Sequence, residues 1–234
     1  MKLGIIGAME QEIETLLCKM QGVSQRECAG TVFYDGKLES LSVVVVRCGI
    51  GKVNAALCTQ ILCDLYEVTH IINTGIAGSL CAELDIGDIV ISRDVMHHDV
   101  DCTVFGYACG QVPGMPEVYA SDENLVQLAQ KAAEEISFGH SRIGRVASGD
   151  QFVCSAEKKA QIVADTSAIC TEMEGAAIAQ TAYRNGVPFV VLRAISDKAD
   201  NSAEMDYPTF EQQAAHHCAQ LTQKLSAMLH AGQI

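Results

Sequence analysis

Three acidic side chains follow short β-branched runs, in positions where carboxyl groups can transfer protons. Glu12 follows the first run, Glu174 a late one and Asp197 the last one. In open α/β sheets ligands bind at the carboxyl ends of the strands, so convergence of these ends would bring the three carboxylates together with Arg193. A partly apolar cleft would then separate them into an acid and a base. Each one alone is equally typical of a helix cap or a first-turn acid.

Two other clusters of residues that could bind a ligand give weaker evidence of a functional site. Residues 48–53, CGIGKV, open an expected helix, where backbone N–H groups can face an anion. They lack the third glycine of a dinucleotide fingerprint and the spacing of a P-loop, which favours a tight turn. Residues 97–102, HHDVDC, crowd metal-ligand types into six positions. Adjacent side chains of an extended segment point to opposite sides, so we expect no metal there.

The elements that must position these residues alternate between buried strands and helices. Short apolar runs, too short for helices, predict strands at 3–6, 41–48, 70–73, 88–92, 169–171 and 189–193. Helical patterns lie at 10–20, 53–66, 122–136, 175–185 and 207–230. This alternation predicts an α/β fold, a three-layer αβα sandwich. An antiparallel hairpin, 31–38 with 41–46, makes the central β-sheet mixed. Glycines, among them Gly75 and Gly78, are expected to mark strand ends.

Composition restricts the class of protein and its partners. A chain of 234 residues predicts one domain, 1–234. The net charge of −13, with scattered basic residues, argues against nucleic acid and anionic membrane as partners. No run is long enough to span a bilayer, and the start does not resemble a secretory signal. The eleven cysteines include no Cys-x-x-Cys pair and fall mostly in apolar segments, which favours reduced core thiols and a cytoplasmic location.

The longest irregular stretch, 97–116, has two open readings. It contains Phe105, Tyr107 and Pro113. Long ordered loops are often functional lids or interfaces, and a plain surface loop is about as common.

Seven segments, in order and with matching gaps, carry a resemblance that runs nearly from end to end. They are GIIGAMEQE at the N-terminus, CGIGKVNAA at 48–56, INTGIAGSL at 72–80, GDIVIS at 87–92, SGDQFV at 148–153, TEMEGAAIA at 171–179 and RAISDKAD at 193–200. In these segments the chain resembles the bacterial 5′-methylthioadenosine/S-adenosylhomocysteine nucleosidases of the nucleoside phosphorylase superfamily. The resemblance implies an αβα sandwich, a homodimer and a place in methionine salvage.

The resemblance also implies a role for each acidic residue. Asp197 is the expected general acid at N7 of adenine, and Glu12 the expected base that activates water. Glu174 would hold the ribose hydroxyls and stabilise an oxocarbenium-like ribosyl cation. Ser196 and Arg193 would orient these groups.

The implied substrate-binding set covers both ends of a thionucleoside. Phe152 would stack on adenine, whose edge the backbone at Phe152 and Val153 would read, and apolar residues would hold the 5′-alkylthio group. The residues implied are Met9, Ile50, Ile76, Gly78, Phe152, Val153, Glu172, Met173, Glu174, Arg193, Ser196 and Tyr207, with Cys102, Phe105, Tyr107 and Pro113 from the partner subunit. No cofactor and no metal is implied.

Departures from the family pattern bear on the substrate and the reaction. Ile76 stands where several relatives place a hydroxyl residue, and Cys102 and Tyr207 stand where apolar residues are common. Phosphorylase relatives carry Arg and Ser at the positions of Asn73 and Ile76, so the sequence favours hydrolysis over phosphorolysis. The alternatives are a nucleoside phosphorylase, a hydrolase of a nucleoside with a larger 5′ group such as an aminodeoxyfutalosine, and a binding module without activity. 5′-Deoxyadenosine is a further candidate substrate.

Overall fold

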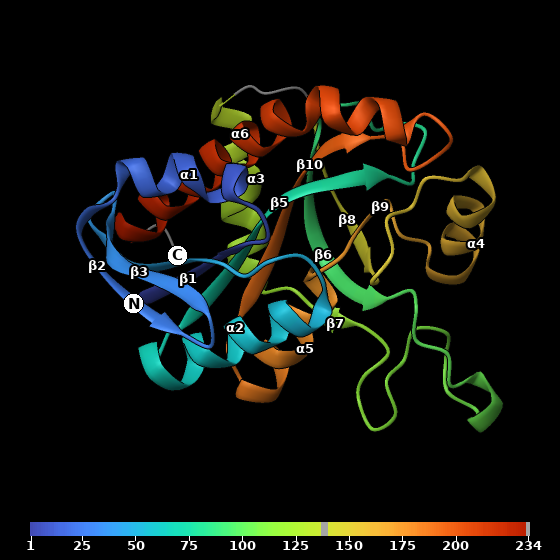
Figure 1. The fold of residues 1–234 in the computed structure, drawn as a ribbon, viewed down its shortest axis with the longest axis horizontal. Helices are drawn as coiled ribbons and strands as arrows, with labels where there is room; N and C mark the ends of the chain where they lie inside the picture. Colours follow the sequence, from blue (N-terminus) through green and yellow to red (C-terminus); the bar gives the residue numbers. More distant parts are fainter. Residues whose placement is uncertain (137–139, 233–234) are drawn as a thin grey trace.

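The computed structural model describes residues 1–136 and 140–232, except the side chain of Met205. Its strands and helices alternate along most of the chain (Figure 1). The strands are β1 (Lys2–Gly7), β2 (Gln21–Cys28), β3 (Thr31–Leu38), β4 (Leu41–Arg47), β5 (His70–Ser79), β6 (Ile89–His97), β7 (Tyr119–Ala120), β8 (Ser141–Ser148), β9 (Cys170–Glu172) and β10 (Phe189–Asp197). The α-helices are α1 (Glu10–Lys19), α2 (Lys52–Tyr66), α3 (Glu123–Ile136), α4 (Ala156–Thr166), α5 (Gly175–Asn185) and α6 (Ala203–His230), and a 3-10 turn, η1, covers Thr103–Phe105.

The strands form one mixed sheet. Its order is β10-β6-β8-β9-β5-β1-β4-β3-β2, and β7 pairs with β6. β1 runs parallel to β4 and β5, whereas β3 pairs antiparallel with β4, as the sequence predicts. Because β10 also pairs with β5, the strands β5, β10, β6, β8 and β9 close into a ring. The sequence pattern did not predict this ring.

Helices cover both faces of the sheet, which confirms the αβα sandwich (Figure 1). One core lies under α1, α3 and α6 and includes Leu3, Val43 and Leu192. The other lies under α2 and α5 and includes Val44 and Val191. Strands covered on both faces consist of continuous apolar residues, and for this reason their runs showed no alternation.

Several expected element boundaries were wrong. β5, β6 and β10 extend beyond the predicted runs, so Gly75 and Gly78 lie inside β5 rather than at its end. β2, β8 and α4 were missed; β2 is exposed along most of its length and therefore lacks an apolar signal. α6 begins at Ala203, one turn before the expected start. Proline disfavours helical backbone at the residue before it, but Pro208 lies inside this helix.

The cysteine prediction needs a correction. All eleven thiols are free, but only Cys48, Cys58, Cys170 and Cys218 are buried. The other seven are half-buried or exposed, so core packing accounts for only these four. Within the two described ranges, no helix has the length and apolar character needed to cross a bilayer.

Candidate active site

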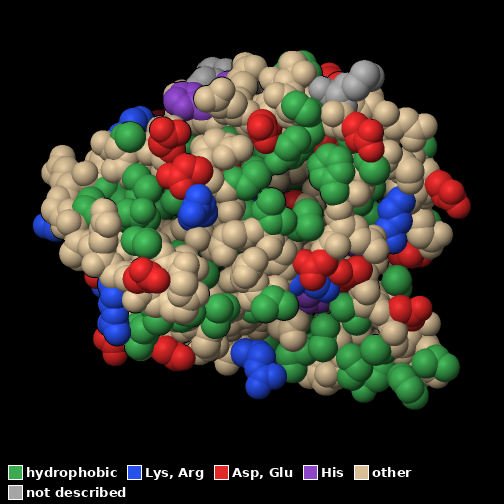
Figure 2. Space-filling model, viewed as in Figure 1, with side chains coloured by type: hydrophobic (Ala, Val, Ile, Leu, Met, Phe, Trp, Pro, Cys, Tyr) green, Lys and Arg blue, Asp and Glu red, His purple; other side chains and the backbone are tan. Residues whose placement is uncertain are grey.

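A pocket of about 500 Å³ opens where β5, β9 and β10 end beside the starts of α1, α5 and α6. We call it the central pocket. Figure 2 shows a hollow near the middle of this face, with hydrophobic side chains around it and acidic atoms inside. Its lining residues are Ala8, Met9, Glu12, Ile50, Ile76, Ala77, Gly78, Phe152, Thr171, Glu172, Met173, Glu174, Ser196, Asp197 and Tyr207. Twelve of these fifteen belong to the set expected from sequence.

Glu12 is held by three backbone N–H groups. Its Oε2 accepts hydrogen bonds from the N–H groups of Ala8 (2.6 Å) and Met9 (2.9 Å), and its Oε1 accepts one from Ile76 (3.1 Å). Burial raises the pKa of Glu12 above its ordinary value, against the lowering effects of Arg193 and these N–H donors. A carboxylate with such donors and a raised pKa suits a general base near neutral pH.

Glycine at position 75 makes room for this arrangement. A Cβ there would collide with Glu12 Oε1 and would lie 2.9 Å from Arg193 Nη1. Gly78 does the same for Asp197, since its Cβ would lie 2.8 Å from Asp197 Oδ1. Glu12 and Asp197 therefore sit against positions of β5 that are three residues apart, about 10 Å along a strand.

Arg193 is 1% exposed and joins the strands behind the pocket. It donates hydrogen bonds to Glu172 and to Asn73 Oδ1 (2.6 Å), and its Nη2 lies 3.9 Å from Glu174 Oε2. Although burial lowers the pKa of Arg193, the Glu172, Glu12 and Glu174 carboxylates raise it above its ordinary value. Its charge is therefore fixed, and it lies behind the pocket lining rather than in it.

Glu172 is the principal counter-ion of Arg193. It also accepts hydrogen bonds from the Ser148 hydroxyl and from the N–H groups of Glu174 (3.1 Å) and Gly175 (2.8 Å). Burial by itself raises the pKa of Glu172, but Arg193, Ser148 and the Gly175 N–H outweigh it and hold the pKa below its ordinary value. Glu172 is thus an ionised carboxylate that orients its neighbours.

Glu174 shares this charge cluster but differs in protonation. It is the N-cap of α5, and its Oε1 accepts a hydrogen bond from the Gly51 N–H (2.8 Å). Burial, and then the neighbouring Glu172, raise the pKa of Glu174 to about 8. Gly51, at φ 99°, belongs to the 48–53 segment, whose turn serves Glu174 rather than a nucleotide phosphate.

Asp197 ends β10 apart from this cluster. Its Oδ2 accepts a hydrogen bond from the Ser196 hydroxyl (2.8 Å), and its Oδ1 accepts one from the Ala199 N–H (2.8 Å). Burial raises the pKa of Asp197, and the nearby Asp206 and Asp200 add to that effect. No ion pair involving Asp197 occurs among the described residues. A buried carboxyl of this kind is suited to donate a proton.

Aromatic and apolar residues form the walls. The Phe152 ring lies edge-on to the Tyr207 ring, with centroids 5.4 Å apart, and the Tyr207 hydroxyl donates to Met9 Sδ (3.2 Å). Phe152 and Ile50 are about half exposed and stand at the rim. An aromatic ring at the rim suits a flat, aromatic ligand.

A family model described as "Phosphorylase superfamily" matches residues 2–227. A 5′-methylthioadenosine/S-adenosylhomocysteine nucleosidase from Oceanobacillus iheyensis is 45% identical, over 94% of this chain and 96% of its own. The crystal structure of the nucleosidase of that name from Neisseria meningitidis, in complex with methylthio-immucillin-A, superposes with a TM-score of 0.94 at 40% identity, covering 97% of this chain and 98% of that one. This chain belongs to the 5′-methylthioadenosine/S-adenosylhomocysteine nucleosidase family.

One other similar structure bears on the substrate. The native structure of a futalosine hydrolase from Helicobacter pylori superposes with a TM-score of 0.91 at 35% identity and covers 96% of both chains. The nucleosidase family fold therefore also occurs in an enzyme named for a different nucleoside.

Six residues of the expected set do not line the central pocket of this nucleosidase-family chain. Val153 packs in a small core beside it, and Arg193 lies behind it. Cys102, Phe105, Tyr107 and Pro113 lie on the segment between β6 and β7, where Phe105 is 78% exposed. These four cannot complete the pocket of their own chain as it stands.

Sequence reasoning missed five residues of the site. Ala8, Ala77 and Thr171 line the pocket, and Thr171 Oγ1 is buried with no hydrogen-bond partner among the described residues. Asn73 and Ser148 act from behind, by binding Arg193 and Glu172. Asn73 and Thr171 lie in runs that read as plain core, Ala77 and Ser148 lie outside the predicted strands, and Ala8 lies outside any strand.

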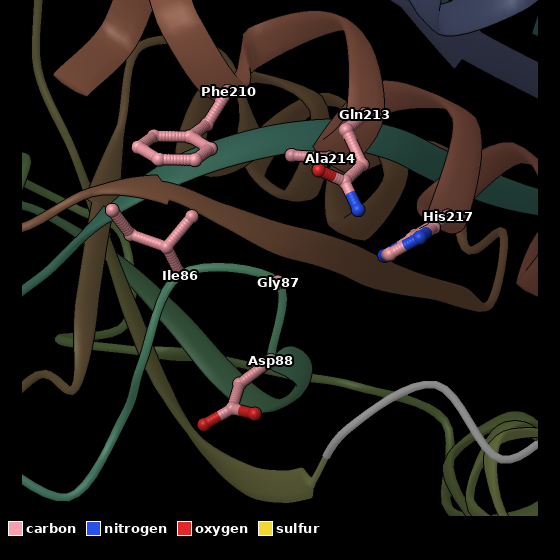
Figure 3. Close-up of a pocket in the computed structure, with 7 residues that line it drawn as sticks. All are labelled: Ile86, Gly87, Asp88, Phe210, Gln213, Ala214 and His217. Carbon is pink, nitrogen blue, oxygen red and sulfur yellow. The ribbon is translucent and has the colours of Figure 1, made fainter.

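Two other features of the sequence have structural explanations. His97 hydrogen-bonds Gln180 (3.0 Å), and Asp99 pairs with Lys52 (2.6 Å), so these side chains are directed to different neighbours. A separate cavity of about 270 Å³ lies between α6 and the turn at Ile86–Asp88, and Figure 3 shows the residues that line it. Asp88 points away from α6 there, and its oxygens accept the N–H groups of Asp85 and His140, which closes the turn.

We expect Glu172→Gln to destabilise the protein by about 3 to 5 kcal/mol, because it leaves the Arg193 guanidinium buried without its main counter-ion. Urea unfolding measures the change. The matched control is Glu135→Gln, which breaks an exposed pair with Lys224 (2.5 Å) and should cost less than about 1 kcal/mol. Equal losses in the two variants would contradict the assigned role of Glu172.

Glu174→Gln should stabilise the protein increasingly as pH rises from 4.5 to 8. The unfolded carboxyl ionises near 4.5, whereas the folded one resists ionisation until about 8, so the parent loses stability across this window and the variant does not. Unfolding free energies at both pH values should show the variant's advantage growing by more than about 1 kcal/mol, the equivalent of one pKa unit. A constant difference would mean that Glu174 is ionised in the folded protein.

Proposed function

We propose that this chain hydrolyses the N-glycosidic bond of 5′-methylthioadenosine and S-adenosylhomocysteine, releasing adenine and the 5′-thio-ribose. The observation that carries the proposal is a single pocket lined by two buried carboxyl groups, Glu12 and Asp197, with separate hydrogen-bond partners. The names of the family's members, given above, support the same substrates. Water supplies a hydroxyl to the sugar and a proton to the base, so the reaction needs no other reactant.

Asp197 is the proposed acid. It protonates N7 of adenine, so that the base leaves as a neutral molecule. Its raised pKa supports this role, because the carboxyl must carry a proton near neutral pH. The Ser196 hydroxyl fixes one oxygen of the carboxyl group, which leaves the acid a defined orientation toward the base. Phe152 is the proposed platform for the adenine ring.

Glu12 is the proposed base, and Glu174 the proposed partner of the sugar. Glu12 removes a proton from the water that attacks the anomeric carbon. Glu174 binds ribose hydroxyls and faces the positive charge that develops on the ring. Arg193, engaged with Glu172 and Asn73, positions this end and does not itself meet the water.

The lining favours water over phosphate as the second substrate. Cationic side chains are common partners of phosphate in proteins. The fifteen described lining residues include no Lys or Arg, and the buried Ile76 occupies one of the positions that phosphorylases use to grip phosphate.

A homodimer completes the proposed active site. Cys102, Phe105, Tyr107 and Pro113 would reach the 5′ end of the partner's pocket. The exposed apolar side chains of Val53, Val104 and Phe105, at 78%, 84% and 78%, support such an interface, since side chains of this kind are usually covered. The proposal also includes one domain over 1–234 and a cytoplasmic location, which the eleven free thiols support.

The test is incubation of the purified protein with 5′-methylthioadenosine, with and without phosphate, and identification of both products. Adenine with free methylthioribose, at a rate independent of phosphate, is the expected result. A sugar 1-phosphate would instead identify a phosphorylase. Release of adenine only from an aminodeoxyfutalosine would move the chain to the futalosine hydrolase activity, and no release from any nucleoside would leave a binding module.

Asp197→Asn should lower kcat by about 10²- to 10⁴-fold and leave nucleoside binding nearly unchanged, because the amide cannot donate the proton. Adenine release measures the first effect and calorimetric titration with 5′-methylthioadenosine the second. Turnover at the parent rate would refute the assignment of the acid.

Phe105→Ala should raise KM for 5′-methylthioadenosine several-fold while kcat stays near that of the parent, because the change removes apolar contact with the 5′ group and touches neither carboxyl. Val104→Ala is the matched control, because the same interface would cover Val104 but the proposed substrate-binding set does not include it. A Phe105→Ala variant that binds substrate as well as the parent would remove the shared pocket.

A further inference from the structure

A second hollow adjoins the central pocket. It has a volume of about 610 Å³ and shares Ala8, Met9 and Ile50 with that pocket. We call it the outer hollow. Its remaining lining residues are Glu10, Gln11, Ile13, Gly30, Thr31, Val32, Tyr34, Arg47, Cys48 and Gly49.

The outer hollow lies next to the end of the central pocket that holds Glu12 and Glu174. Met9 donates its N–H to Glu12, and Gly51, which follows Ile50, donates its N–H to Glu174. Asp197, in contrast, lies against Gly78, which is about 10 Å further along β5 than Gly75, the glycine next to Glu12. If adenine lies at Asp197 and ribose at Glu174, as the proposed function requires, a long substituent on the 5′ carbon leaves past Met9 and Ile50.

Opposite charges stand in this outer hollow. Arg47 Nη1 and Glu10 Oε2 are 3.1 Å apart, and both side chains are more than half exposed. Arg47 is the one Lys or Arg among the described residues that line either hollow. An exposed pair of this kind contributes little to stability, so a ligand that brings both charges can exchange with it at little cost.

We infer that the outer hollow binds the amino-acid end of nucleosides with a zwitterionic 5′-thio substituent, with Arg47 on the carboxylate and Glu10 on the ammonium group. An α-amino acid presents these two charges close together, as the pair itself does. The planar guanidinium suits a carboxylate, which it binds through two hydrogen bonds. Arg47 and Glu10 then determine specificity between long and short 5′ substituents and take no part in bond cleavage. This inference rests on the proposed function.

The experiment compares Arg47→Ala with the parent on two substrates that differ only beyond the sulfur atom. For S-adenosylhomocysteine, kcat/KM should fall about five- to tenfold through KM, as for loss of one exposed charge-assisted contact. For 5′-methylthioadenosine, kcat and KM should stay within about twofold, because the methyl group ends before the outer hollow. The matched control is Arg142→Ala, which breaks an exposed pair with Glu83 (3.5 Å) outside both hollows. It should leave kcat and KM unchanged for both substrates.

A third substrate isolates the carboxylate. The 3-aminopropylthio analogue of S-adenosylhomocysteine keeps the ammonium group and lacks the carboxylate, so Arg47→Ala should leave its kinetics unchanged or improved. Equal effects of Arg47→Ala on all three substrates, or an effect on none, would overturn the inference while the proposed function stands. A parent protein that cleaves no 5′-methylthioadenosine would overturn both the inference and the proposed function. The parent is therefore assayed before any variant is made.

Discussion

The charge cluster around Arg193 is the constraint on which the rest of the site depends. One guanidinium, 1% exposed, is surrounded by Glu172, Glu12 and Glu174. Three full negative charges against one positive charge would be costly at this depth, since burial penalises every uncompensated charge. Glu172, which bonds Arg193 directly, keeps its charge, and Glu174, 3.9 Å away, keeps its proton to about pH 8. The cluster therefore sets protonation states as well as positions.

The same cluster ties together elements that are distant in the sequence. Arg193 lies on β10, Asn73 on β5 and Glu172 at the end of β9, and Glu174 caps α5. Glu12 joins from α1 through the Ile76 N–H of β5. Because β5 has glycine at position 75, α1 and β10 can approach it closely enough for both Glu12 and Arg193 to lie against it. A side chain at this position would displace Glu12 from its three N–H donors. The position of the proposed base therefore depends on backbone groups.

Sequence reasoning predicted what depends on local pattern and missed what depends on closure of the sheet. The hairpin of β3 and β4 was predictable because Glu39 and Ser40 join a run that alternates polar and apolar residues to an apolar run. In the structure both residues adopt positive φ (49° and 67°) in the turn. The convergence of Glu12, Glu174 and Asp197 followed from the rule on strand ends. The ring of five strands was not predictable, because β9 is three residues long and β8 begins with exposed residues. The position of Arg193 behind the pocket, rather than in it, depends on that ring.

Asp197 lies apart from the Arg193 cluster, and this separation suits it to act as the acid of the proposed reaction. Asp197 forms no ion pair among the described residues and burial raises its pKa, so its proton stays available for a leaving base. At the other end, burial and the neighbouring Glu172 raise the pKa of Glu174 to about 8. A ribosyl cation forming beside it would lower this pKa, because the ionised carboxylate attracts the positive charge. The attraction is then stronger in the transition state than with bound substrate, and only such a difference accelerates the chemical step.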